Sequence, residues 1–213
     1  FNVRDESLHA LSGISAQNTT VKIEGTRFES DGPLLITHWG LSGPGILKLS
    51  AWAARQLHAL NYDFMIRVCW DHRYSRDTWM ENIKEWRTEH SRSRVRSYTP
   101  AQIPQRLWLY LMDGLQVGDI LWADVSNRQL ERMIDSLVSS NFHVQGKSTF
   151  KDEFVTAGGV KLSEVDFRTM RSKLFSNLWF CGEVLDIDAV TGGFNFQAAW
   201  TTAMIAAQSL KAE

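Results

Sequence analysis

The spacing of apolar residues changes twice along this chain, and those changes limit the folds that it can adopt. Up to about residue 69 the pattern is that of strands, as in Thr20–Gly25, where β-branched and charged residues alternate up to a glycine. From about 75 to 140 the apolar residues recur at helical spacing, and residues 142–150 again alternate as in a strand. The sequence therefore predicts an α+β protein in which a helical segment separates two β-rich stretches.

Within the helical segment, two capping boxes are predicted, at Thr78–Glu81 and Ser126–Gln129. In each, a hydroxyl would accept from a backbone N–H, while the Glu or Gln side chain reaches back to the capping residue. Another helix is expected to begin at Ile103–Pro104, since proline is tolerated in a first turn, and to end at Gly114.

Residues 154–213 follow a third pattern. Leu178–Cys181 is a continuous apolar run that ends at Gly182, as expected for a strand buried on both faces. Acidic residues and Gly192–Gly193 come next, and a helix rich in small residues is expected from Phe194 to Leu210. This order is typical of α/β architecture, in which ligands bind beyond the carboxyl ends of the strands.

Gly192 and Gly193 have the chemistry of a binding turn. Without Cβ atoms, they let the backbone approach a flat ligand closely. The helix starting at Phe194 would direct free amides and its positive dipole end at that ligand, which suits a carbonyl edge or an anionic ring. Asp186 or Glu183 could accept hydrogen bonds from ligand hydroxyls. The alternative is a tight turn between strand and helix with solvated acids, and the spacing alone favours neither interpretation.

Three blocks of the sequence resemble motifs of a bacterial family of NAD(P)/FAD-dependent oxidoreductases, the BaiN-like or aminoacetone-oxidase-like flavoproteins. Thr156–Val160 resembles the point at which the family's chain re-enters its FAD domain. Gly182–Asp186 and Gly192–Asn195 together resemble its flavin-contacting turn and helix. Thr37–Pro44 resembles a motif of the family's inserted domain. The blocks follow the family's order across essentially the whole chain.

The resemblance implies a multidomain α+β fold. Residues 1–74 and 141–154 would form a β-barrel-like subdomain, residues 75–140 a helical insertion, and residues 155–213 the C-terminal strand–helix segment of an FAD-binding α/β domain. Two positions depart from the family's pattern. Ala189 stands where glycine is expected, and Ala203–Met204 replaces a more usual Thr-Gly-like step.

The resemblance also implies FAD as cofactor and NAD(P)H as a reductant. The residues that it assigns to the flavin are Thr156, Gly158, Gly159, Gly182, Glu183, Asp186, Gly192, Gly193, Phe194 and Asn195. His38 becomes a candidate for positioning or protonating a substrate. The alternative is a structural, hydrogen-bonded histidine, which is the commoner role for an isolated histidine at a strand end.

Members of the family are about twice as long, and their N-terminal half carries a G-x-G-x-x-G turn for the FAD pyrophosphate. The nearest pattern here, Gly40-x-x-Gly43-x-Gly45, lacks the third spacing and is interpreted as a turn before a helix that ends near His58. We therefore expect the C-terminal part of an FAD-dependent oxidoreductase, inactive and without FAD on its own. Its main partner would be the missing N-terminal half, and its exposed C-terminal segment could support a dimer.

Composition limits the further partners and the location that can be expected. With 23 Lys and Arg against 24 Asp and Glu, the net charge is −1, so no global field attracts nucleic acid or anionic membranes. No apolar run reaches the ~18 residues of a membrane span, and no signal peptide is recognisable. Cys69 and Cys181 lie in apolar runs, as expected for thiols in a reducing compartment, so a cytoplasmic location is predicted. The histidines lack metal-ligand spacing, and no metal is expected.

Residues 90–106 form the one strongly charged cluster. The arginines of this stretch, which contains no acid, are Arg92, Arg94, Arg96 and Arg106. They could contact phosphates of RNA or of a nucleotide, which would make the chain a substrate- or RNA-binding module without activity of its own. The alternative, which we favour, is a solvated loop between helices. Trp79 and Trp86, seven residues apart on one predicted helix, are more typical of a core than of a stacking platform.

Overall fold

The computed structural model describes residues 1–100, 102–147 and 155–212, so parts of the stretches predicted at 142–150 and 154–213 lie outside the described residues. Contacts divide the chain into two compact units. The first unit comprises residues 1–49 and 56–148, and the second comprises residues 50–55 and 149–213. The sheet and the helical segment share the first unit, and the three-part domain division stays a prediction.

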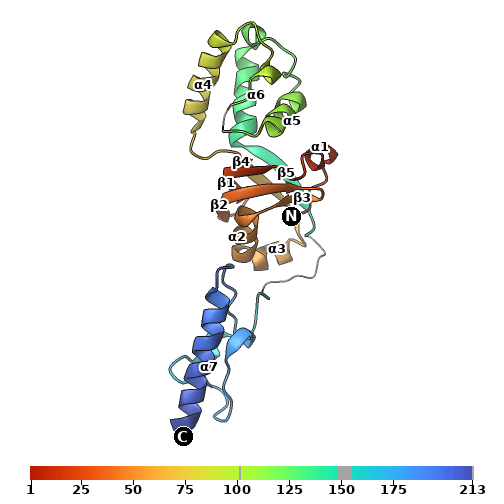
Figure 1. Cartoon of the computed structure of the whole chain (residues 1–213). Coiled ribbons are helices and arrows are strands. Elements are labelled where there is room, and N and C mark those ends of the chain that lie inside the picture. The colour runs from red at the N-terminus through yellow and green to blue at the C-terminus, as the bar shows by residue number, and fades with distance from the viewer. Residues whose placement is uncertain (101, 148–154, 213) are drawn as a thin grey trace. The chain divides into compact units, whose positions relative to one another are not determined.

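An antiparallel sheet of five strands forms the centre of the first unit (Figure 1). Its strands are β1 (Ser15–Ile23), β2 (Glu29–Thr37), β3 (Gly40–Ser42), β4 (Asp63–Cys69) and β5 (Ser140–Gln145). They lie in the order β3–β2–β1–β4–β5. The alternation predicted for β1 is confirmed, because Val21 and Ile23 are fully buried and Lys22 between them is not.

The five strands do not close into the expected barrel. The segment Phe1–Val3 forms hydrogen bonds at both edges of the sheet, beside β3 and beside β5. On the β3 side, the Leu41 amide donates to the Phe1 carbonyl at 3.0 Å and the Val3 amide to Trp39 at 3.0 Å. On the β5 side, the Gln145 amide donates to the Asn2 carbonyl at 2.9 Å. A short N-terminal segment therefore lies between the two edges of the sheet and bridges them.

Helices cover the sheet on both sides. Figure 1 shows α2 (Pro44–Trp52) and α3 (Ala54–Ala59) on the side opposite to α4, α5 and α6, while α1 (Glu6–His9) precedes β1. The single helix predicted to end near His58 is interrupted between Trp52 and Ala54. Apolar residues of these short helices, including Leu8, Leu49 and Leu57, are fully buried.

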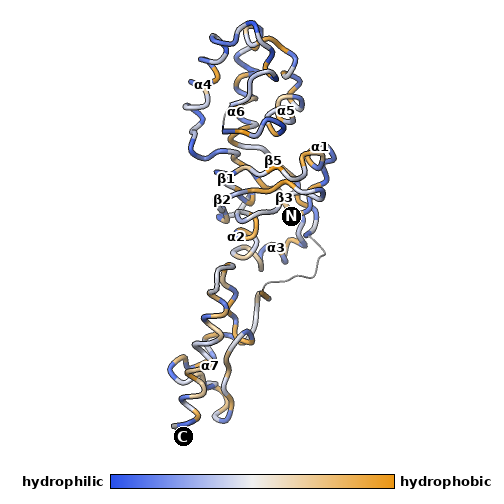
Figure 2. Tube along the Cα trace, viewed as in Figure 1, coloured by the Kyte–Doolittle hydropathy of each residue, from blue (hydrophilic) through white to orange (hydrophobic). Residues whose placement is uncertain are grey.

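The helical segment contains α4 (Arg76–Glu89), α5 (Gln105–Gly114) and α6 (Asn127–Val138), with the short 3₁₀ helices η1 (Val95–Ser97) and η2 (Trp122–Asp124) between them. In α6 the capping box at Ser126 and Gln129 is confirmed. In α4 the predicted box is wrong, because Ser75 is the capping residue and accepts from the Thr78 amide at 3.1 Å. Figure 2 shows that α4 is largely hydrophilic, and just two of its residues, Trp79 and Ile83, are buried.

Trp70 fixes the junction between sheet and helical segment. Its amide donates to the Leu137 carbonyl at 2.9 Å, and its indole N–H donates to Ser140 Oγ at 2.8 Å. The neighbouring His72 amide donates to the Asn18 carbonyl at 2.8 Å. The chain leaving β4 is thus tied to α6, to the start of β5 and to β1, which holds the two parts of this unit together.

The second unit has little core of its own. It contains η3 (Leu162–Glu164), β6 (Val165–Asp166), β7 (Arg171–Ser172), η4 (Gly182–Val184) and α7 (Phe194–Ala212). Its buried apolar cluster consists of Val165, Met170, Leu185 and Ala206. The predicted buried strand Leu178–Cys181 is wrong, because Leu178 is 40% exposed and Cys181 is exposed. Among the described residues this run makes one isolated bridge, from Trp179 to Arg171, and a strand buried on both faces needs neighbours on both sides.

A large apolar face of α7 is exposed within this unit. Phe196, Trp200 and Met204, spaced one helical turn apart, are 65%, 69% and 61% exposed, and the first two rings stack at 6.0 Å. Even so, among the described residues no helix combines the length and apolarity that crossing a bilayer requires.

We predict that Gly40→Ala unfolds the first unit at lower denaturant concentration. A Cβ there would lie 2.6 Å from the Val3 amide nitrogen, and the backbone φ of 146° is unfavourable for other residues. The expected loss of unfolding free energy is about 2–4 kcal/mol. Gly13→Ala is the control: φ is also positive but no atom lies within 4 Å of its Cβ position, so only about 1 kcal/mol should be lost. Equal losses in the two variants, measured by urea unfolding, would contradict a role for the N-terminal contact.

Candidate functional site

The glycine turn of the second unit lies directly before α7. Gly192 and Gly193 have φ values of 144° and 88°, a region that side chains rarely adopt. No atom lies within 4 Å of the position that a Cβ of Gly193 would take. The backbone here therefore borders open space, as a turn that approaches a flat ligand requires, and α7 begins at the next residue, Phe194.

Two of the predicted blocks, far apart in sequence, lie side by side in this unit. The Val160 amide donates to the Val184 carbonyl at 2.8 Å, and the Asp186 amide donates to the Val160 carbonyl at 3.1 Å, in a parallel bridge. Gly159 permits this approach, because a Cβ there would lie 2.6 Å from the Val184 carbonyl oxygen. The structure thus brings Gly159 next to Val184–Asp186; Gly158 precedes this contact, and Thr156 is exposed.

Asn195 holds the loop in front of α7. Its Oδ1 accepts from the Ala189 amide at 2.9 Å, and its Nδ2 donates to the Ala189 carbonyl at 2.9 Å. Its side chain is therefore occupied within the loop, and any ligand contact would be made by its backbone. Thr202, which the sequence did not single out, likewise pins Gly182 by accepting from its amide at 3.0 Å.

The two candidate acids differ in their surroundings. Glu183 is exposed. Asp186 is 21% exposed and forms an ion pair with Arg55 of the same unit, and its hydrogen bond raises the pKa of that guanidinium. A ligand hydroxyl would have to share the Asp186 carboxylate with Arg55, a partner that no local sequence pattern could have indicated.

In the first unit, the block Thr37–Pro44 forms the β2–β3 turn, β3 and the start of α2. His38 is exposed, and its ring meets Trp39 edge-on at 4.2 Å. Gly43 and Gly45 allow close backbone packing instead of cradling a phosphate: a Cβ at Gly43 would lie 2.8 Å from the Pro33 carbonyl oxygen. The space in front of this turn is filled by β2.

Two of the four arginines in the cluster are paired with acids from other parts of the helical segment. Arg94 pairs with Asp119 at 3.1 Å, and Arg96 pairs with Asp113 at 2.7 Å, which raises the pKa of Arg96. Arg106 donates to the Ala10 carbonyl. Arg92 is exposed and has no ion pair within the described part of the chain. A general phosphate-binding patch is therefore less well supported than the sequence suggested.

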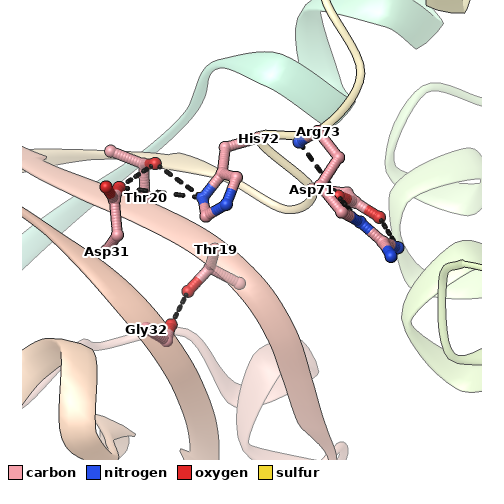
Figure 3. Close-up of polar contacts among 7 residues, drawn as sticks. All are labelled: Thr19, Thr20, Asp31, Gly32, Asp71, His72 and Arg73. Atoms are coloured by element: carbon pink, nitrogen blue, oxygen red, sulfur yellow. Dashed lines mark hydrogen bonds and ion pairs between the residues drawn. The ribbon is translucent and has the colours of Figure 1, made fainter.

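A polar cluster joins the sheet to the segment after β4 (Figure 3). Asp71, 1% exposed, accepts from Arg73 Nη2 at 2.7 Å and Nε at 2.9 Å. Beside it, Thr20 Oγ1 donates to Asp31 and lies 3.2 Å from His72 Nδ1. Because the carboxylate of Asp71 is matched by an arginine of its own loop, we interpret this cluster as structural.

An open, mainly apolar groove of about 870 Å³ lies between α1, α5 and α6. Tyr110 donates to Asp5 at 2.7 Å there, and burial raises the pKa of the phenol. For metal binding, the described residues contain no group of three or more His, Cys, Asp or Glu side chains suited to an ion.

Comparison with known proteins adds a family and three relatives. A family model described as HI0933-like protein barrel and H2TH domain matches residues 1–155. Ribosomal RNA dihydrouridine synthase of Escherichia coli is 30% identical over 207 residues, which are 96% of this chain and 48% of that protein. Its Haemophilus influenzae namesake is 30% identical over 211 residues, 99% of this chain and 49% of that protein.

The third relative is 3-dehydro-bile acid delta(4,6)-reductase of Clostridium scindens, 23% identical over 182 residues, 85% of this chain and 44% of that protein. The chain thus spans about half the length of the curated relatives that it matches.

We predict that Gly159→Ala opens the second unit without affecting the first. The new Cβ would separate Val160 from Val184–Asp186, so hydrogen exchange at the Val160 and Asp186 amides should become at least about tenfold faster, equivalent to about 1.4 kcal/mol. Gly158→Ala is the matched control, because its φ of 115° is also unfavourable but its Cβ position is open. Similar exchange in both variants would show that the close approach at Gly159 is unimportant.

Proposed function

Because this chain belongs to the family of HI0933-like proteins with a barrel and H2TH domain, we propose that it forms the flavin-ring side and the substrate side of an FAD-dependent reductase. Support comes above all from two features of one loop: it is bridged to Val160 at Val184–Asp186, and it ends in the Gly192–Gly193 turn, where the Cβ position of Gly193 is open. The 23% identical bile acid reductase is consistent with oxidoreductase chemistry.

The residues of the turn fit a flavin. The backbone at Gly193 borders open space, and the amides at the start of α7 would donate to the electron-rich edge of the ring. Asn195 would keep the loop at Ala189 in place, and Asp186 or Glu183 would accept from a ribityl hydroxyl. When bound, the flavin supplies hydride transfer, and the chain supplies binding, orientation and electrostatics.

We further propose that the reaction is reduction of a carbon–carbon double bond, with NAD(P)H as the source of hydride. Dihydrouridine is uridine whose C5–C6 double bond has gained two hydrogens, and the bile acid enzyme is named as a reductase. Such a reduction also needs one proton, and His38 remains the candidate in this chain for positioning the substrate or delivering that proton.

Uridine in ribosomal RNA is the substrate that we favour. The two relatives named for it are 30% identical over at least 96% of this chain, against 23% over 85% for the bile acid enzyme. An RNA-binding module without activity is the second candidate. It rests on Arg92, Arg94 and Arg96, and the pairing of the last two with acids weakens it.

The exposed face of α7 fits this proposal. An apolar helix face of this kind favours burial against another surface. We propose that the remainder of a longer protein, including a pyrophosphate-binding half, covers Phe196, Trp200 and Met204. A dimer through the same face is the alternative, and the oligomeric state of the whole protein distinguishes them.

The reaction is tested with the whole protein, FAD, NADH or NADPH and an unmodified ribosomal RNA transcript. Mass spectrometry of the digested RNA should show a uridine heavier by two hydrogen atoms, together with oxidation of the nicotinamide. Reduction of a steroid enone with no change in the RNA would show that the substrate is not RNA. Absence of any bound flavin would contradict the proposed function.

We predict that Gly193→Val raises the FAD dissociation constant of the whole protein about tenfold or more, since about 1.4 kcal/mol of lost contact is one decade of affinity. The branched side chain would occupy the space that the ring edge needs. Gly25→Val is the control, because its φ of 71° and open Cβ position impose a similar backbone strain in the other unit. If both variants lose stability but neither loses FAD affinity, Gly193 is not part of the flavin site.

A further inference from the structure

A row of aromatic rings leads from the core of the helical segment to its surface. Ring contacts join Trp79 to Trp86 at 6.2 Å, Trp86 to Tyr98 at 5.3 Å, and Tyr98 to His90 at 4.1 Å. The last pair is stacked, with 29° between the ring planes. Trp79 is fully buried, Trp86 and Tyr98 are partly buried, and the His90 side chain is 32% exposed.

The backbone holds the outer rings in place. His90 is the C-terminal capping residue of α4, and its amide donates to the Trp86 carbonyl at 2.8 Å. The Ser93 amide donates to the His90 carbonyl at 2.8 Å, and Tyr98 follows η1 directly. The outer rings are therefore positioned by hydrogen-bonded backbone at both ends of the loop, and little ordering would be needed on binding a ligand.

Charge alone cannot make this loop bind nucleic acid. Arg94 and Arg96 are paired with acids, and Glu89 lies 4.0 Å from His90. The exposed Arg92 is the arginine of this loop that remains for a phosphate. A ligand of the loop would therefore have to gain its affinity from the rings, with at most a small electrostatic contribution.

We propose that the outer face of the His90 ring, backed by Tyr98 and Trp86, stacks an unpaired base of the RNA substrate, while Arg92 contacts an adjacent phosphate. This inference rests on the proposed function, which provides the RNA. Proteins recognise RNA mainly through unpaired bases stacked on aromatic side chains, and stacking tolerates any base because every base has a π-face. The surface would hold the RNA without selecting the uridine to be reduced.

The experiment measures binding of the full chain to a short, fluorescein-labelled oligouridylate by anisotropy. His90→Ala and Tyr98→Leu should each weaken binding about tenfold. Tyr98→Phe keeps the ring and should bind as the unaltered chain does. Leu121→Ala is the matched control, because Leu121 bridges to Arg94 and is 39% exposed but has no ring. His90 lies at a helix end, so its variant is expected to keep the thermal midpoint of the unaltered chain.

Salt dependence provides a second readout. Arg92→Gln should reduce the slope of log K against log salt by about 0.7, the value for one phosphate of a single strand. Arg94→Gln should leave that slope unchanged, because Asp119 already neutralises Arg94.

Unchanged RNA affinity in both ring variants would overturn this surface while leaving the RNA substrate in place. Loss of binding in Tyr98→Phe as well as Tyr98→Leu would also contradict stacking. If the unaltered chain does not bind the oligouridylate at all, this proposal fails; dihydrouridine formation by the whole protein would then still test the proposed function independently.

Discussion

Phe1–Val3 hydrogen-bonds to the backbone at both edges of the sheet, and the rest of the first unit depends on that interaction. An antiparallel sheet with two open edges exposes rows of unpaired amides and carbonyls, which favour association with other chains. Here one short segment bonds to Leu41 and Trp39 on one side and to Gln145 on the other. Gly40 is needed at the crossing because any Cβ would displace this segment. The sheet buries many apolar side chains, and the contacts of Trp70 join it to the helical segment.

The second unit is held together differently, with a small apolar core. Its buried apolar cluster of four residues is far smaller than the apolar core of the first unit, and much of α7 presents apolar side chains to solvent. What organises it is backbone proximity, with Gly159 against Val184–Asp186 and Asn195 around Ala189. In this unit glycines and short backbone contacts define an open turn, and one apolar face of the helix is exposed. Such a unit is well suited to be one wall of a site that another part of a protein completes.

Features that depend on a residue's near neighbours in the chain could be predicted from the sequence. Strand alternation in β1, the box at Ser126 and the start of α7 are local, and each is confirmed. Features that depend on distant residues were mispredicted or missed. The acids that neutralise Arg96 and Arg94 lie 17 and 25 residues away. Among the described residues, Leu178–Cys181 pairs with the short strand β7 alone. The bond of Asn195 to Ala189 has no sequence signature. The glycine turn itself could be predicted from composition and resemblance, while its role toward a flavin stays a prediction.

The central claim is that the turn before α7 borders a flavin ring, and a structure of the whole protein with FAD tests it most directly. The quantity to measure is the distance from the isoalloxazine ring atoms to the backbone nitrogens of residues 193–196. Our account predicts at least one separation of about 2.7–3.2 Å, that of a hydrogen bond, with the ring facing Gly193. A flavin ring that contacts none of residues 182–195 would contradict it.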